Sequence, residues 1–213
     1  MKLEGTLTYA TAFAAGFALM GFEIFGVRIL TPAFGSGFHV WGALIAVVMA
    51  GLALGYALGG RMADDRAPWP LAASLLALAG VLMLLFPLAA VPVKRLVPEL
   101  ISDRRLGALA AAALLFPLPT LAIGASTPVL VKANVSSLEG VGRGAGNVQA
   151  AGTAGGIAGT LASAFVLVRT TPSSHAVAAF GVLLLLNAAI LRATVARGTR
   201  TGGGNGGGAE SAD

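Results

Sequence analysis

The chain has 213 residues, of which 56% are hydrophobic and only 11% are charged. A soluble domain carries about 25% charged residues, so a sequence this apolar excludes an ordinary water-soluble fold. Its net charge of +5 would suit a nucleic-acid partner in a soluble protein. Here the basic residues lie in short segments between apolar runs, which is typical of orientation in a membrane, and we expect no nucleic-acid partner. The sequence has no cysteine, which excludes disulfides and thiolate sites.

Six apolar runs are long enough to cross a bilayer, since each spanning helix needs about 20 apolar residues. In chain order they cover about residues 7–30, 39–59, 70–91, 107–131, 144–168 and 172–191. The first run is longer than the apolar core of a signal peptide, so we expect it to remain as a spanning helix. The sequence therefore predicts an all-α polytopic membrane protein. Its six-helix transmembrane domain covers residues 1–193, and a disordered glycine-rich tail covers residues 194–213.

Two charged residues lie towards the end of the first run. Glu23 is inside the apolar segment, where a carboxylate is unfavourable unless it faces protein, water or a partner. It is a candidate for binding a proton or a cationic substrate, and the alternative is a structural hydrogen bond or ion pair. Arg28 follows about 140° further around the helix, so the two side chains do not face one another. Arg28 is the second candidate for substrate binding, although its side chain can equally reach the membrane surface.

Glycines recur at helical spacing in the second and fifth runs. The candidates for helix packing are Gly51, Gly55 and Gly59 in the second run and Gly152, Gly156 and Gly159 in the fifth. On a helix each set forms one stripe, along which another helix can approach backbone to backbone. The two stripes are expected to pack either on each other or on a second copy of the chain, and the alternative is that each forms a glycine face along a substrate path.

A charged segment follows the second run directly. The apolar residues end at Gly59 and Gly60, which predicts a tight charged turn at the membrane surface over residues 61–66. Arg61, Asp64 and Arg66 form either a latch that biases two conformations or an ordinary solvated loop.

The segment between the third and fourth runs, residues 93–106, mixes apolar and basic positions at helical spacing. This pattern predicts a short helix lying in the membrane interface. The fourth run is interrupted by Pro117, Pro119 and Pro128. Proline frees backbone carbonyls that can line a cavity, and the alternative is a kink that only shapes packing.

Other types of site have no support in the sequence. The only histidines, His39 and His175, have no carboxylate at metal-ligand spacing. The glycine-rich residues 142–146 lack the third glycine and the preceding strand of a dinucleotide site. No nucleophile stands with a base at a useful spacing. We therefore expect no metal, no cofactor and no catalytic residue.

Six spans place both termini on one side of the membrane. Basic residues are slightly more numerous on that side. Most of those on the other side belong to residues 93–106, where they would hold a helix at the surface. The positive-inside rule therefore favours a cell-membrane protein with both termini in the cytoplasm.

The spacing of several residues resembles the membrane domain of the fused MFS/spermidine synthase-like family, over about residues 7–193. The positions that carry this resemblance are Glu23, Arg28, Pro32, Gly35, Trp41, Gly42, residues 51–56, Gly59, Gly60, Arg61, Asp64, Gly124, Pro128, Gly142 and Arg143. In that family a soluble aminopropyltransferase-like domain typically follows the membrane domain. This sequence continues only into the glycine-rich tail, so the resemblance implies the membrane fold and not the enzymatic activity.

Residues 60–66 also resemble the loop between the second and third helices of MFS transporters, and six helices correspond to one MFS half. This resemblance implies a transport-type half-unit in the lipid bilayer for a small solute such as a polyamine or another cation. A homodimer would supply the second half. Two alternatives stay open. The first is a non-catalytic anchor or regulatory subunit for a separate, soluble spermidine synthase-like enzyme, and the second is a purely structural membrane protein.

Overall fold

The computed structural model describes residues 2–135 and 140–202, with side chains placed for residues 5–135 and 140–194. All regular elements in these ranges are helices. They are α1 (Lys2–Phe34), α2 (Phe38–Asp65), α3 (Pro68–Leu100), α4 (Arg104–Leu115), α5 (Pro117–Asn134), α6 (Val141–Leu161), the π-helix η2 (Ala162–Leu167), α7 (Val168–Thr170) and α8 (Ser173–Gly202). The prediction of an all-α fold is confirmed for the described part of the chain.

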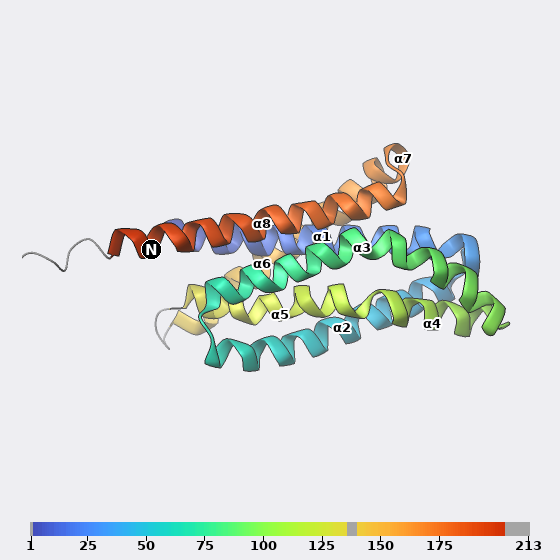
Figure 1. Cartoon of the computed structure of the whole chain (residues 1–213), viewed down its shortest axis with the longest axis horizontal. Coiled ribbons are helices and arrows are strands. Elements are labelled where there is room, and N and C mark those ends of the chain that lie inside the picture. The colour runs from blue at the N-terminus through green and yellow to red at the C-terminus, as the bar shows by residue number, and fades with distance from the viewer. Residues whose placement is uncertain (1, 136–139, 203–213) are drawn as a thin grey trace, which may run out of the picture.

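Five of these helical segments are each long and apolar enough to cross a membrane. Helices α4 and α5 meet the same criterion together, as a pair bent by 53°, which brings the number of possible spans in the described residues to six. Figure 1 shows the helices side by side along the long axis, with the N-terminus and the end of α8 at the same end of the bundle. The chain is therefore a multi-pass membrane protein.

The bend between α4 and α5 is held by aromatic packing. Phe116 connects the two helices, and Pro117 begins α5, so the break falls at one of the predicted prolines. The Phe116 ring lies 4.9 Å from that of Phe22 and 5.0 Å from that of Phe86, between centroids. Phe22 and Phe86 are themselves 4.8 Å apart. Such clustered rings contribute beyond their buried area, so they fix the bend against α1 and α3.

The helices pack as three pairs. The most extensive contacts join α1 to α6, α2 to α5 and α3 to α8. Helix α3 also packs on α5, and α8 also packs on α1. The α3–α8 pair therefore connects the other two pairs along one side of the bundle.

Glycine brings the backbones together in every pair. A Cβ atom added to Gly155 of α6 would overlap the carbonyl oxygen of Phe13 in α1. One added to Gly59 of α2 would overlap that of Ala125 in α5. In the third pair Gly80 and Gly181 face each other, and a Cβ on Gly80 would lie 2.8 Å from the carbonyl oxygen of Gly181. Each pair is thus a close backbone contact of the kind that stabilises helices in lipid.

The predicted interfacial helix is wrong. Residues 93–100 continue α3 without a break, and only Ile101, Ser102 and Asp103 separate α3 from α4. Val97, one of the apolar positions in that pattern, is buried against the bundle. Apolar residues at helical spacing look the same whether a helix lies flat or prolongs a span, so the pattern could not distinguish the two.

The predicted turn after Gly59 is also wrong, because α2 continues to Asp65 and Arg61 and Asp64 are helical residues. At the other end of the chain, α8 extends to Gly202, into the range expected to be the disordered tail. The rest of that predicted tail, residues 203–213, lies outside the described residues.

Candidate functional site

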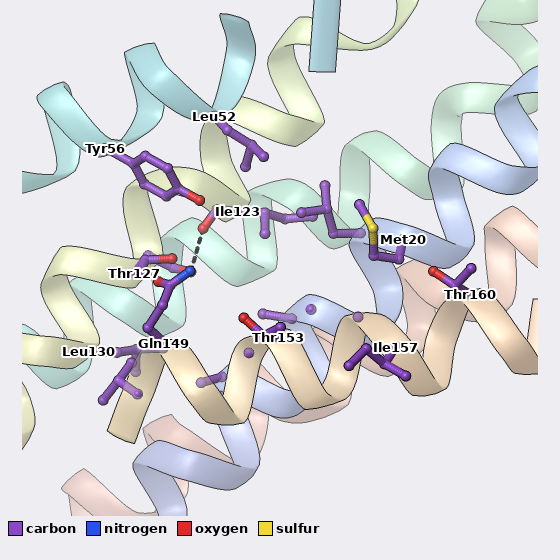
Figure 2. A pocket seen from close by; sticks show the side chains of 18 of the residues that line it. Met20, Leu52, Tyr56, Ile123, Thr127, Leu130, Gln149, Thr153, Ile157 and Thr160 are labelled. Carbon is purple, nitrogen blue, oxygen red and sulfur yellow. Dashed lines mark hydrogen bonds between the residues drawn. The ribbon is translucent and has the colours of Figure 1, made fainter. Parts of the chain in front are cut away.

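A pocket of about 480 Å³ lies between the α1–α6 pair and the α2–α5 pair. Its walls come from those four helices, and no residue of α3 or α8 lines it. Most of the lining is aliphatic, including Leu52, Ile123 and Leu130. Figure 2 shows these side chains around the central space. A concave, mostly apolar site with a few polar groups is the usual form of a small-molecule pocket.

Polar side chains enter this pocket from α2, α5 and α6. Figure 2 shows Tyr56, Thr127, Gln149, Thr153 and Thr160 directed towards its interior. Tyr56, Thr127, Thr153 and Thr160 have no hydrogen-bond partner among the residues that the structure describes, whereas Figure 2 marks a hydrogen bond at the Gln149 side chain. Polar groups without partners are unfavourable in lipid, so at this depth they indicate a site that holds water, a ligand or another protein.

The pocket opens outwards between α2 and α6. Met49 and Tyr56 on α2 are 53% and 42% exposed, and Ile157 on α6 is 58% exposed. The inner wall is closed, since Ile123 and Leu130 of α5 are almost fully buried. The opening is therefore a lateral one, on the side of the bundle away from the α3–α8 pair.

A polar cluster lies one helical turn beyond the pocket residues Ala12 and Leu130. Asn134 Nδ2 donates a hydrogen bond of 3.1 Å to the hydroxyl oxygen of Tyr9, and Asn147 Nδ2 donates a longer one of 3.5 Å. These contacts join α1, α5 and α6 across one end of the pocket. The sequence alone does not reveal this cluster, because its members lie far apart in the chain.

Glu23 lies towards the opposite end. Its position on α1 is one turn beyond Leu19 and Met20, which line the pocket, and on the same helix face. The side chain is half-buried, and it has no hydrogen-bond or ion-pair partner in the described ranges. The structure therefore places the first candidate residue next to the pocket without a structural partner for its carboxylate.

Arg28 is in a different situation. Its Nη1 donates to the carbonyl oxygen of Val168 at 2.7 Å and to that of Thr171 at 3.2 Å. These carbonyls lie at the C-terminal end of the α6–η2–α7 segment, where a cation is favourable. Arg28 thus joins two helix ends and does not line the pocket.

The proposed latch residues Arg61, Asp64 and Arg66 are all exposed, and no ion pair joins them within the described part of the chain. The contact at this end of α2 comes instead from Lys132, in the last turn of α5. Its ammonium group donates to the carbonyl oxygens of Ala63 and, at 3.1 Å, of Asp64. Lys132 could not be recognised from the sequence, because a single basic residue at the end of a span ordinarily indicates only how the span is oriented in the membrane.

The glycine stripe of α2 packs on α5. Added Cβ atoms on Gly51 and Gly55 would overlap the Thr120 hydroxyl and the Leu121 carbonyl oxygen. The two stripes therefore do not pack on each other.

The stripe of α6 is divided between two surroundings. Gly159 contacts the α1 backbone at Phe17. Gly155, which was outside the predicted set, contacts it at Phe13. Gly152 and Gly156 line the pocket and also pack on α1, since a Cβ added to Gly16 would overlap the Gly152 carbonyl oxygen and lie 3.1 Å from the Gly156 nitrogen.

No known protein family, characterised protein or solved structure matches this chain. The resemblance to the membrane domain of spermidine synthase-like proteins and to an MFS half therefore stays a prediction from spaced residues.

Proposed function

We propose that this chain is a transport-type half-unit that works as a homodimer and moves a small cationic solute, of which polyamines are one class. The observation that carries the proposal is the pocket between the two helix pairs. It combines an aliphatic wall with polar side chains, of which Tyr56, Thr153 and Thr160 have no hydrogen-bond partner among the described residues. Lipid alone does not account for those polar groups.

The lateral opening supports a second copy as the partner. Tyr56 and Thr153 lie on the exposed side of α2 and α6, where lipid would leave their polar atoms without hydrogen bonds. A second copy related by a two-fold axis along the membrane normal would cover this side and join the two pockets into one. The polar groups would then line a shared, water-accessible path.

Glu23 supports a cationic solute. It brings a negative charge to the pocket side of α1, and Arg28 does not neutralise it, because Arg28 is bound to helix-end carbonyls. A positive group entering the pocket would meet this carboxylate at one end.

We also propose that both termini face the cytoplasm of a cell-membrane protein. The distribution of basic residues supports this orientation through the positive-inside rule. Labelling of cysteines introduced at Ser36 and at Ala67, each with an impermeant reagent on intact cells, measures it. Labelling at position 36 alone is expected, and labelling at position 67 alone would reverse the orientation.

The experiment that tests the function is uptake of radiolabelled spermidine into liposomes that contain only this protein. The wild type and the control Glu99→Gln, which alters an exposed carboxylate at the end of α3, should transport equally. Glu23→Gln should lower uptake about tenfold or more, the effect of losing about 1.4 kcal/mol of interaction with the cation. Equal uptake by the Glu23→Gln variant and the wild type would refute the role of Glu23.

Oligomeric state is measured in parallel, by cross-linking cysteines introduced at Thr153 or Ile157. Disulfide-linked dimers are expected for both positions, since both lie at the opening. A monomer, no uptake and recovery of a soluble aminopropyltransferase-like protein in equal amount from native membranes would instead establish the anchor function.

A further inference from the structure

We propose that Glu23 and Ser163 together bind a monovalent cation, at the level where α6 passes into η2, and that the cation reaches them from the pocket. The inference deepens the proposed function and rests on it for the class of solute, because a polyamine carries this charge as an ammonium group. A sodium or potassium ion has the same binding chemistry.

The register of α1 and α6 brings the two residues to one level. Gly155 contacts Phe13 and Gly159 contacts Phe17, so the helices run parallel with matching turns. Continued by one turn, this register brings Ser163 to the level of the α1 residues that follow Phe17. Arg28 then contacts Val168, which shows that the register continues beyond this point. Glu23 lies between Phe17 and Arg28 and therefore falls in the same turn as Ser163.

Ser163 is an unusual residue in this interface. It is fully buried, and its Oγ atom has no hydrogen-bond partner among the described residues. The buried hydroxyls of Thr120 and Ser126 bond to carbonyls of the preceding turn, whereas that of Thr11, like that of Ser163, has no partner among the described residues. A buried hydroxyl left without a partner calls for an explanation, and a bound cation supplies one.

The local helix geometry supports a cation site at Ser163. Residues Ala162–Leu167 form a π-helix, in which the Val168 N–H bonds to the carbonyl oxygen of Ser163, five residues back. Short π-helical segments are rare and frequently occur at functional sites. The wider turn displaces the α6 backbone beside Glu23, on the helix face that carries Ser163.

The pocket provides the path. Met20 on α1 and Thr160 on α6 lie at one end of it, as Figure 2 shows. Glu23 is one turn beyond Met20, and Ser163 is one turn beyond Thr160. A solute in the pocket therefore needs to move by about one turn, roughly 5 Å, to bring a positive group to both residues.

The charge of the site selects a monovalent cation. Glu23 contributes one negative charge, and Ser163 contributes a neutral oxygen. A divalent ion such as Ca²⁺ usually takes several carboxylates and six to eight oxygens, which these residues do not provide. One ammonium group or one alkali ion matches the single carboxylate.

The test is protection of Glu23 from N,N′-dicyclohexylcarbodiimide, which modifies protonated carboxyl groups in apolar surroundings. The full chain in mild detergent is labelled, and the modified peptide is quantified by mass spectrometry. Spermidine, sodium chloride, potassium chloride and choline chloride are added separately. Labelling at Glu23 is expected, with protection by spermidine or by one alkali ion and none by choline, whose quaternary head carries no N–H donor.

The variants identify the role of Ser163. Ser163→Ala should still be labelled at Glu23, but about tenfold more cation should be needed for half-protection, because one ligand oxygen is lost. Ser174→Ala, which removes an exposed hydroxyl at the start of α8, is the matched control and should behave as the wild type. Protection by spermidine alone assigns an ammonium site, and protection by sodium or potassium alone assigns an alkali-ion site. Absence of labelling at Glu23, absence of protection by any cation, or equal protection in Ser163→Ala would overturn the proposal.

This measurement is separate from transport, since it needs neither a sealed vesicle nor a second copy. Protection without uptake in liposomes would refute the proposed transport and leave the cation site in place. Uptake in liposomes without protection of Glu23 would support the proposed transport and refute the cation site.

Discussion

The α3–α8 contact and the seam between the α1–α6 and α2–α5 pairs are built in opposite ways. In the first, Gly80 and Gly181 face each other and the two backbones meet. At the seam no such glycine contact joins the two pairs, and a pocket of about 480 Å³ remains. Close backbone contact within a pair leaves no room for a ligand, whereas two rigid pairs that meet through side chains can enclose one.

The distribution of polar residues follows the same division. Along α3 and α8 leucines and alanines predominate, and the hydrogen bond between Arg192 and Ser74 lies towards one end of the bundle. The exception on α8 is Asn187, whose buried Oδ1 has no partner among the described residues. The seam carries a tyrosine, a glutamine and several threonines at membrane depth. In lipid this contrast separates a surface that only has to pack from one that has to receive something.

The largest effect is expected where the backbones touch. Gly59→Ala forces α2 and α5 apart, because the new Cβ would overlap Ala125, and overpacking of this kind destabilises by about 1–3 kcal/mol. Gly60→Ala is the matched control, since nothing lies within 4 Å of a Cβ at that position. Thermal unfolding in detergent measures both. Equal melting temperatures for the two variants would show that the α2–α5 pair is looser than described.

Filling the seam should change transport and not stability. Thr153→Phe places a ring in the pocket, and because Thr153 is exposed, no neighbour has to move. We expect spermidine uptake to fall about tenfold while the melting temperature stays within the range of surface substitutions, about ±0.5 kcal/mol. Ala154→Phe is the control, because Ala154 is exposed and does not line the pocket. If both variants transport alike, the pocket is not on the path.

A smaller effect is expected at the end of the α2–α5 pair. Lys132→Met keeps the apolar stem but removes the donor to the carbonyl oxygens of Ala63 and Asp64. The free energy of unfolding, measured by thermal unfolding in detergent, should fall by about 1 kcal/mol. This is the usual contribution of such a hydrogen bond together with the interaction of the cation with the helix end. Arg143→Met is the control, since Arg143 is exposed and has no partner within the described ranges. A comparable loss in Arg143→Met would indicate a general effect of charge.

The smallest effect is expected at the start of α4, outside the spans. The backbone N–H groups of Leu106 and Arg105 donate to the Asp103 carboxylate and hold the pKa of Asp103 below its ordinary value of 3.8. A lowered folded-state pKa stabilises the fold above the unfolded pKa, and this contribution is lost as the pH falls through the folded pKa. Asp103→Asn should therefore keep the cap but remove this part of the acid dependence of the melting temperature.

The control for this cap is Asp65→Asn, at the C-terminal end of α2, where no capping bond is made. Its acid dependence should match that of the wild type. An unchanged acid dependence in Asp103→Asn would show that the cap does not contribute.

Much of the fold could be predicted from the sequence. Six apolar runs with polar breaks indicated the spans, because each span requires about 20 apolar residues. The glycine stripes at 51, 55 and 59 predicted a close helix contact, and Pro117 predicted a break. Gly80 and Gly181 were not predicted, because an isolated glycine without a repeat carries no signal about its partner.

Glu23 could be identified as a candidate from its chain position alone, because one carboxylate in an apolar run is conspicuous. Ser163 could not, since a serine in a small-residue helix usually serves packing. Its lack of a partner becomes visible only in the folded structure, where its side chain is buried. Lys132 and the Tyr9–Asn134–Asn147 cluster were missed for the same reason, as their partners lie on other helices.

The sequence by itself determined that the chain is an all-α membrane protein with about six spans, because hydropathy and length act locally along the chain. Only the tertiary structure decided which helices pair, where the pocket opens and which residues share it. Those features depend on the register between helices that are distant in sequence. A stripe of small residues shows that a partner can approach closely, but not which helix approaches or at what height.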